Sequence, residues 1–255
     1  MGKGINKHLL NMGNMYFNYF KNKLFFVPKL RTKDFYDRQK EFYSQFIKKG
    51  SLVFDIGSHI GDKTAVFLSL GAVVVSIEPQ KPCVRYIKKR FLNYDDKSLV
   101  VLNKGLSNEV GMQKMYICDG ATTISTFSDQ WKDGRFKDYI WGRSKIVPVT
   151  TLDAVISEYG VPDFCKIDVE GFEYNVLKGL SRPIRNISFE FVKEFLDQAL
   201  LCMKLIENLA PTEFNWCCGT DFQFENSVSK DELYYNLNKS EDSLLNGDIY
   251  SFSSI

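Results

Sequence analysis

Short apolar segments that alternate with helix-patterned segments constrain the fold of this chain more than any other feature. Apolar runs predict strands at 52–55, 73–77, 99–102, 164–167 and 187–191, with late strands near 214–217 and 249–252. Helical spacing predicts helices at 62–70, 82–93, 152–159, 172–180 and 196–209, and residues 112–118 and 146–149 also look extended. This alternation predicts an α/β fold, with a parallel sheet covered by helices on both faces.

Acidic residues follow the first two predicted strands. Asp55 ends the first strand, and Glu78 ends the second, 23 residues later. Between them lies a loop in which Gly57 and Gly61 flank His59. Ligands of open parallel sheets bind beyond the carboxyl ends of the strands, and an acid about 20 residues past a glycine loop can accept hydrogen bonds from ribose hydroxyls. The pattern therefore favours a nucleoside cofactor, although a tight turn without a ligand stays an alternative.

The composition of the loop separates two classes of cofactor. A dinucleotide needs bare backbone around its diphosphate, whereas His59 adds a side chain there and Asp62 opens the next helix with a negative charge. S-adenosylmethionine has no phosphate, and its amino-acid tail suits the acid Asp55 and a polar His59. The loop therefore favours S-adenosylmethionine over NAD.

Three stretches carry a family resemblance: VFDIGSHIGDKT at 53–64, VSIEP at 75–79, and VTTLDAVISEYGVPDFCKIDVEGFEYNVLKGL at 149–180. Together they resemble FkbM-type methyltransferases, which are S-adenosylmethionine-dependent O-methyltransferases. The likeness runs from about residue 52 to residue 191, with a further match in DIYSF near the carboxyl terminus. It implies a class I methyltransferase-like fold, that is, a doubly wound, mostly parallel seven-stranded sheet with helices on both faces.

The resemblance also implies which residues contact the cofactor. His59 stands where the family typically has Asn, and Gly105 stands where it has Ala. By position, two of the residues lie near the adenine, Asn103 and Leu106. The full set of expected cofactor residues is Asp55, Gly57, His59, Gly61, Glu78, Asn103 and Leu106.

Methyl transfer to an alcohol requires a group that takes the hydroxyl proton. The chain has two histidines, His8 near the amino terminus and His59 in the cofactor loop, so a histidine base is not expected. Asp168 ends the predicted strand 164–167, and Lys166 lies two residues earlier on the same face. We therefore predict that Asp168 is the base and that Lys166 tunes its charge.

Other acids near this strand end are also candidates for catalysis. Glu170 and Glu173 stand at the start of the next helix, where they could instead compensate the helix dipole. Glu190 lies inside the apolar strand ISFEF and requires a partner, for which Lys166 is a candidate. Three acids could also hold Mg²⁺, but the sequence assigns no metal ligand. The expected catalytic residues are Asp168, Lys166, Glu170 and Glu190.

Charge is unevenly distributed along the chain. Residues 1–50 contain eleven Lys and Arg against three acids, whereas residues 221–255 contain seven acids against two Lys. We predict a basic, aromatic-rich helical extension at 1–46, with helical spacing at 5–23, followed by a methyltransferase domain at 47–255. Aromatic residues of a second helix, closed by Gly50, should pack on the domain. The basic arm could lie beside the acidic segment, or it could contact a membrane surface or an anionic glycan.

The remaining features narrow the setting and the substrate. The chain has no apolar stretch long enough to span a membrane and no secretory signal, and its six cysteines form no C-x-x-C pair. These features indicate a cytoplasmic protein. The family resemblance implies that the acceptor is a hydroxyl of a sugar, glycan or natural product. A nucleic-acid acceptor is disfavoured, because the acid cluster would repel phosphates and the net charge is only +2. Alternatives are a catalytically silent methyltransferase-fold binding protein and an NAD-dependent enzyme.

Overall fold

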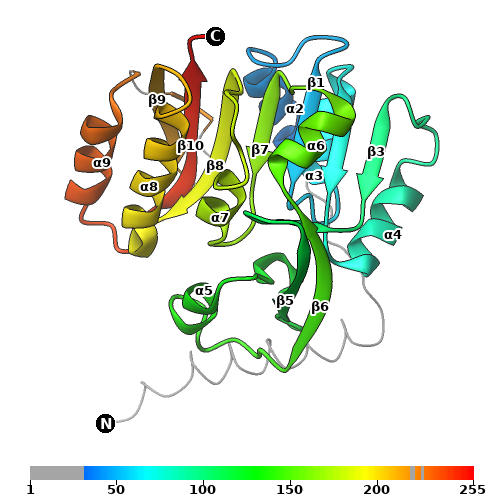
Figure 1. Cartoon of the computed structure of the whole chain (residues 1–255), viewed down its shortest axis with the longest axis horizontal. Helices are drawn as coiled ribbons and strands as arrows, with labels where there is room; N and C mark the ends of the chain where they lie inside the picture. Colours follow the sequence, from blue (N-terminus) through cyan, green and yellow to red (C-terminus); the bar gives the residue numbers. More distant parts are fainter. Residues whose placement is uncertain (1–31, 219–221, 225–226) are drawn as a thin grey trace.

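A seven-stranded sheet forms the centre of the molecule (Figure 1). The computed structural model describes residues 32–218, 222–224 and 227–255. The strand order is β3-β2-β1-β7-β8-β10-β9. The strands are β1 (Leu52–Ile56), β2 (Val73–Ile77), β3 (Leu99–Leu102), β7 (Phe164–Ile167), β8 (Asn186–Val192), β9 (Thr212–Cys218) and β10 (Asn246–Ser253).

The sheet is parallel except at β10, which pairs antiparallel with both β8 and β9. The order runs outwards in both directions from the junction of β1 and β7, so the sheet is doubly wound. The predicted class I methyltransferase-like sheet is therefore confirmed. Since parallel strands end at the same edge, the residues that follow β1, β2, β7 and β8 gather at one side of the molecule.

Helices cover both faces of this sheet. The helices are α2 (Lys33–Tyr43), α3 (Asp62–Ser69), α4 (Lys81–Arg90), α6 (Leu152–Tyr159), α7 (Glu173–Leu177), α8 (Leu196–Glu207) and α9 (Lys230–Lys239). One apolar cluster joins the sheet to α6, α7, α8 and α9, and a second joins it to α2, α3 and α4. Neighbouring residues of β1 enter different clusters, Val53 the second and Phe54 the first, as the pleat of a strand requires.

A separate three-stranded sheet lies beyond the carboxyl ends of the parallel strands (Figure 1). It contains β4 (Gly105–Leu106), β5 (Gly111–Ile117) and β6 (Arg143–Thr150), and the short helix α5 (Asp129–Asp133) lies in the β5–β6 connection. The extended segments that the sequence predicts there are confirmed. Their pairing with each other, outside the main sheet, is a further finding.

The helix before β1 packs on the domain, as predicted. Thr32 caps α2, and Phe42 and Tyr43 at its end are buried in the second apolar cluster. The helical segment predicted at 5–23 lies outside the described residues, so the boundary near residue 46 stays a prediction. Across the part of the chain that the structure describes, every helix is too short or too polar to cross a membrane.

Several helices differ from the sequence prediction: α4 ends at Arg90 and not at residue 93, and the short α5 was not predicted. The predicted helix at 172–180 is shorter, since α7 covers only Glu173–Leu177. The sequence analysis missed α9. Its residues Leu233 and Leu237 are buried in the first apolar cluster. A signal for it exists, because Ser229 caps the helix and Glu232 stands three residues later, as in a capping box.

Candidate active site

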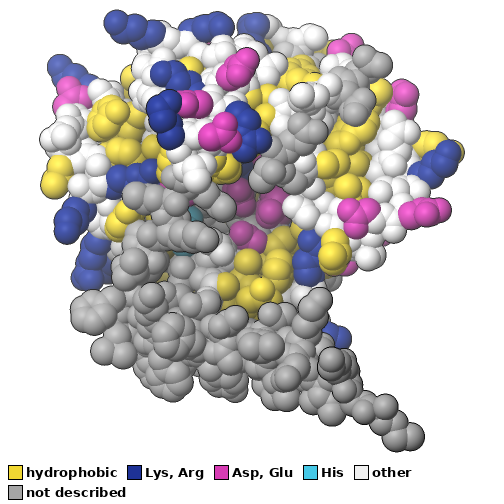
Figure 2. Space-filling view, turned by 180° about the vertical axis from the view of Figure 1, so that it is seen from behind, with side chains coloured by type: hydrophobic (Ala, Val, Ile, Leu, Met, Phe, Trp, Pro, Cys, Tyr) yellow, Lys and Arg dark blue, Asp and Glu magenta, His cyan; other side chains and the backbone are white. Residues whose placement is uncertain are grey.

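A cavity of about 350 Å³ opens at the carboxyl edge of the main sheet. Its walls come from the ends of β1 and β2 with the loops after them, from the segment after β7, from β8 and β10, from the three-stranded sheet, and from α2 and α3. Figure 2 shows acidic side chains gathered in a hollow on this face, with hydrophobic side chains beside them. The cavity lies where a doubly wound sheet is expected to bind its ligand.

The loop after β1 approaches β7 so closely that it requires glycine. Gly57 has a φ of +78°, and a Cβ atom there would lie 1.8 Å from the carbonyl oxygen of Asp168. Gly61 also has a positive φ, and a Cβ atom there would lie 2.9 Å from the ring of Phe91. These two predicted cofactor residues therefore fix the path of the loop along the cavity.

His59 takes the left-handed conformation, with a φ of 46°, and its side chain lines the cavity. Its Nε2 lies 3.1 Å from Oγ1 of Thr122, which belongs to the segment after β5. Burial lowers the pKa of the imidazole to about 4, so the ring is neutral near pH 7. The side chain thus connects the loop after β1 to the segment after β5.

Asp55 is buried at the end of β1 and lines the cavity. Its Oδ2 accepts a hydrogen bond from the Thr64 hydroxyl on α3. Burial raises the pKa of the Asp55 carboxyl to about 6, although the Thr64 hydrogen bond and the charge of Lys166 oppose this rise. A cationic ligand group would therefore stabilise the charged form of this buried carboxylate.

Glu78 is buried after β2, and its carboxylate accepts two backbone hydrogen bonds. The N–H of His59 donates to Oε2 at 2.9 Å, and the N–H of Gln80 donates to Oε1 at 2.7 Å. Burial raises its pKa to about 8, which exceeds the opposing effect of these hydrogen bonds. Within the described chain no Lys or Arg forms an ion pair with Glu78. The carboxylate can therefore accept further hydrogen bonds from hydroxyl groups of a ligand.

The two residues expected near the adenine have different positions. Leu106 is buried and lines the cavity. Asn103 is exposed, and its Nδ2 donates to the backbone carbonyls of Glu78 and Pro79, each at 3.0 Å. Asn103 therefore supports the turn that carries Glu78, and its neighbours Lys104 and Gly105 line the cavity instead.

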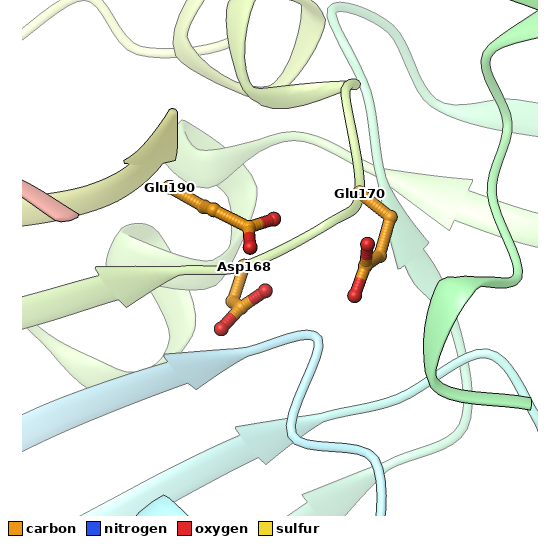
Figure 3. Close-up of side chains that lie close together, drawn as sticks. All are labelled: Asp168, Glu170 and Glu190. Atoms are coloured by element: carbon orange, nitrogen blue, oxygen red, sulfur yellow. The ribbon is translucent and has the colours of Figure 1, made fainter. Parts of the chain in front are cut away.

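Three carboxylates converge on the other side of the cavity (Figure 3). Asp168 and Glu170 follow β7, Glu190 lies on β8, and one oxygen atom of each lies within 4.8 Å of the others. This spacing would also suit a divalent cation. Oε2 of Glu190 is buried and has no hydrogen-bond partner among the described residues. Burial, reinforced by the neighbouring acids, raises the pKa of Glu170 and of Glu190 well above the usual range.

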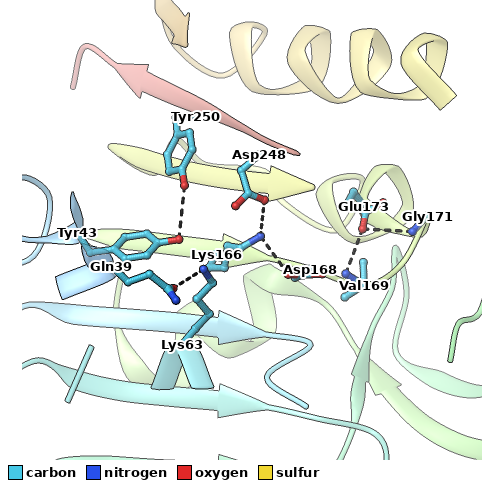
Figure 4. A network of polar contacts seen from close by, with 10 residues as sticks. All are labelled: Gln39, Tyr43, Lys63, Lys166, Asp168, Val169, Gly171, Glu173, Asp248 and Tyr250. Atoms are coloured by element: carbon cyan, nitrogen blue, oxygen red, sulfur yellow. Dashed lines mark hydrogen bonds and ion pairs between the residues drawn. The ribbon is translucent and has the colours of Figure 1, made fainter. Parts of the chain in front are cut away.

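Lys166 is fully buried on β7 and neutralises part of this charge (Figure 4). Its Nζ lies 3.3 Å from Asp168 and 2.7 Å from Asp248. The predicted contact with Asp168 is thus present, whereas the suggested pairing with Glu190 is wrong, because Asp248 takes that place. Asp248 lies on β10, opposite Glu190 in the strand register, and the sequence analysis did not select it.

Glu173 has a structural position outside the cavity. Its Oε1 accepts hydrogen bonds from the backbone N–H groups of Val169 and Gly171, at 3.0 and 3.3 Å. Burial raises its pKa to about 7, against the effect of these hydrogen bonds. The side chain therefore closes the turn between β7 and α7, which agrees with the reading of this acid as support for the helix start.

The cavity fits S-adenosylmethionine in the chemistry of its walls. Asp55 offers a carboxylate for an ammonium group, and Glu78 offers one for hydroxyl groups. Leu106, Met115 and Phe127 give the same cavity an apolar wall suited to a planar base. A diphosphate would need a loop without side chains at this place, whereas the side chain of His59 lines the cavity there.

The sequence model of one protein family, the methyltransferase FkbM domain, matches residues 55–214 of the chain. No curated protein matches it. An O-methyltransferase from Bacillus cereus, solved in complex with SAH, is 12% identical, and the match covers 95% of this chain and 91% of that chain with a TM-score of 0.48. A precorrin-6y C5,15-methyltransferase from Geobacter metallireducens is 10% identical, with coverages of 89% and 93% and a TM-score of 0.47. The chain belongs to the FkbM methyltransferase domain family, and its cofactor is S-adenosylmethionine.

Proposed function

We propose that the protein methylates a hydroxyl group of a sugar, glycan or natural product, with Asp168 as the base. One observation carries the proposal: Asp168 lines the same cavity as the cofactor residues Asp55 and Glu78, and it stands with two further acids. The bound cofactor supplies an electrophilic methyl group. The chain must then align a hydroxyl with that group and remove its proton.

Each residue of the acid cluster has a distinct part in this proposal. Asp168 accepts the proton of the hydroxyl, and the ion pair with Lys166 holds its carboxylate in place. Glu170 and Glu190 accept hydrogen bonds from neighbouring hydroxyl groups of the acceptor, which would give the buried Oε2 of Glu190 a partner. An acceptor with several adjacent hydroxyl groups, such as a sugar, fits this arrangement.

The same charges disfavour a nucleic-acid acceptor. Asp168 already pairs with Lys166, and Glu170 and Glu190 offer no positive charge, so the cluster has no cation to bind the phosphates of a strand. Of the two alternatives that the sequence left open, an NAD-dependent enzyme disagrees with the cofactor of the family, and a silent member that binds a partner without turnover remains. The neutral His59 side chain in the loop also disfavours NAD. A turnover assay distinguishes a silent member from an active methyltransferase.

The test is methyl transfer from labelled S-adenosylmethionine to fractions of an extract of the source organism. We expect label in a small-molecule or glycan fraction, and an O-methyl linkage when the product is examined by NMR. Turnover should persist within a factor of about three in EDTA, well inside the usual contribution of a general base. Cofactor binding without any labelled product would support the silent alternative, and a rate that EDTA abolishes would assign the acid cluster to a divalent cation.

A further inference from the structure

Two polar groups in the cavity lack the partner that their chemistry requires. Gln39 on α2 is 0% exposed, and its Nε2 has no hydrogen-bond partner in the described part of the chain. Lys63 on α3 is half-buried, and its Nζ donates to Oε1 of Gln39 (Figure 4). Both side chains line the cavity. A buried amide N–H without an acceptor is costly, so a ligand atom at this place would be stabilising.

Lys63 also lacks an anionic partner. No carboxylate of the described residues lies within ion-pair distance of its Nζ, which instead lies 5.2 Å from the ring centre of Tyr43 and 5.4 Å from that of Phe222. The aromatic rings exclude water from one side of the ammonium group. A cation in such surroundings favours an anion that it can contact directly.

The opposite charge lies in the same cavity. Asp55 lines it at the end of β1, and the charge of Lys63 acts on the Asp55 carboxyl, whose pKa it helps to lower against the larger effect of burial. A ligand that carries an ammonium and a carboxylate on one carbon atom would satisfy both side chains at once. The amino-acid tail of S-adenosylmethionine has this pair of groups.

We propose that Lys63 and Gln39 bind the carboxylate of the cofactor's amino-acid tail, while Asp55 binds its ammonium group. The ammonium of Lys63 and the Nε2 of Gln39 donate to the carboxylate oxygens. The proposal rests on S-adenosylmethionine as the cofactor. It adds a residue from α2, which precedes the region 55–214 that the family model matches, to the cofactor site.

The test compares two ligands that differ only in this carboxylate: S-adenosylhomocysteine and its decarboxylated analogue, S-adenosyl-3-thiopropylamine. Calorimetry should show that the wild-type chain binds S-adenosylhomocysteine about tenfold or more tightly than the analogue, as expected for a charge-assisted pair. Lys63→Met should remove this preference and leave affinity for the analogue within a factor of about two. Lys63→Arg should keep most of the preference.

Gln39→Leu provides an independent measurement if Lys63→Met is unstable. It removes the orphaned donor at nearly constant volume and should reduce the preference by about threefold or more, as for a neutral hydrogen bond. Lys88→Met, at an exposed position of α4, serves as the matched control and should change nothing. Equal losses for both ligands in Lys63→Met and Gln39→Leu would overturn this proposal alone. A wild-type chain that binds neither ligand would overturn the cofactor assignment as well.

Discussion

The two sides of the cavity hold their carboxylates differently. Asp55 and Glu78, at the ends of β1 and β2, accept hydrogen bonds from Thr64, His59 and Gln80. On the other side, the carboxylates of Glu170 and Glu190 accept none from the described residues. The first side, which we call the cofactor side, is built by neighbouring backbone and hydroxyl groups. The second, the acceptor side, brings acids together without enough donors to satisfy them.

This difference indicates where each side obtains its missing partners. Burying a carboxylate without a donor costs several kcal/mol, and such groups gather at functional sites more often than elsewhere. On the cofactor side the existing hydrogen bonds fix each carboxylate before a ligand arrives. On the acceptor side, Lys166 supplies one fully buried cation, and we infer that the remaining donors arrive with a proton or with the substrate.

The largest effect is expected on the acceptor side, at Asp168. Asp168→Asn keeps the shape of the side chain and removes its basicity, so turnover should fall about 10²–10⁴-fold. Affinity for the donor should stay near that of the wild type, because the cofactor-side hydrogen bonds are unchanged. Single-turnover methylation at matched donor occupancy measures this effect. Rates that agree within a factor of about three would mean that Asp168 is not the base, and Glu170 and Glu190 would be the next candidates.

The reverse result is expected on the cofactor side, at Glu78. Glu78→Ala removes an acceptor for the ribose hydroxyl groups and should weaken donor binding about tenfold or more, which corresponds to about 1.5–3 kcal/mol. Calorimetry with S-adenosylhomocysteine measures the loss, and exposed Glu109 offers Glu109→Ala as a matched control. Unchanged affinity, or tighter binding of NAD than of the methyl donor, would contradict the assignment.

The main sheet could be predicted more accurately than the contacts inside the cavity. The bounds of β2, β3, β7 and α6 agree with the sequence prediction, because each apolar run or helical pattern stops at a clear polar or glycine signal. The acids at the strand ends were likewise visible, since the order of strands in a parallel sheet places them at one edge.

Contacts between distant strands could not be predicted in the same way. The partner of Lys166 is Asp248, which is 82 residues away and reaches it only because β10 inserts antiparallel beside β8. Sequence patterns do not specify which strands become neighbours, so Glu190 was an equally reasonable partner. The cavity contact between Gln39 and Lys63 was missed for the same reason, as it depends on how α2 packs against α3.

The pH dependence of stability should distinguish the cofactor side by a smaller effect. Burial raises the pKa of Glu78 from 4.5 to about 8, so between these values the folded chain holds a proton that the unfolded chain releases. The stability that the folded chain gains from this proton is fully present below about pH 4.5 and is lost as the pH rises through about 8. Glu78→Gln stays neutral, so its Tm should fall by a few degrees less than that of the wild type between pH 5 and pH 8. Parallel Tm curves for the two ligand-free proteins would show that Glu78 is charged throughout.

The smallest effect on the cavity should come from the basic extension. Deleting residues 1–24 removes four Lys and no acids but keeps Thr32, Gln39 and Tyr43, and with them the helix α2 that packs on the domain. The described residues that line both sides of the cavity are all kept, so affinity for S-adenosylhomocysteine should stay within a factor of about two. We expect instead weaker binding to vesicles that contain anionic lipids, by about 1 kcal/mol for each Lys that reaches the surface, and no change with neutral vesicles. Loss of donor affinity in a truncated chain that still unfolds cooperatively would show that the extension belongs to the cofactor side. Equal binding of the full-length and truncated chains to anionic vesicles would show that the extension does not bind a membrane.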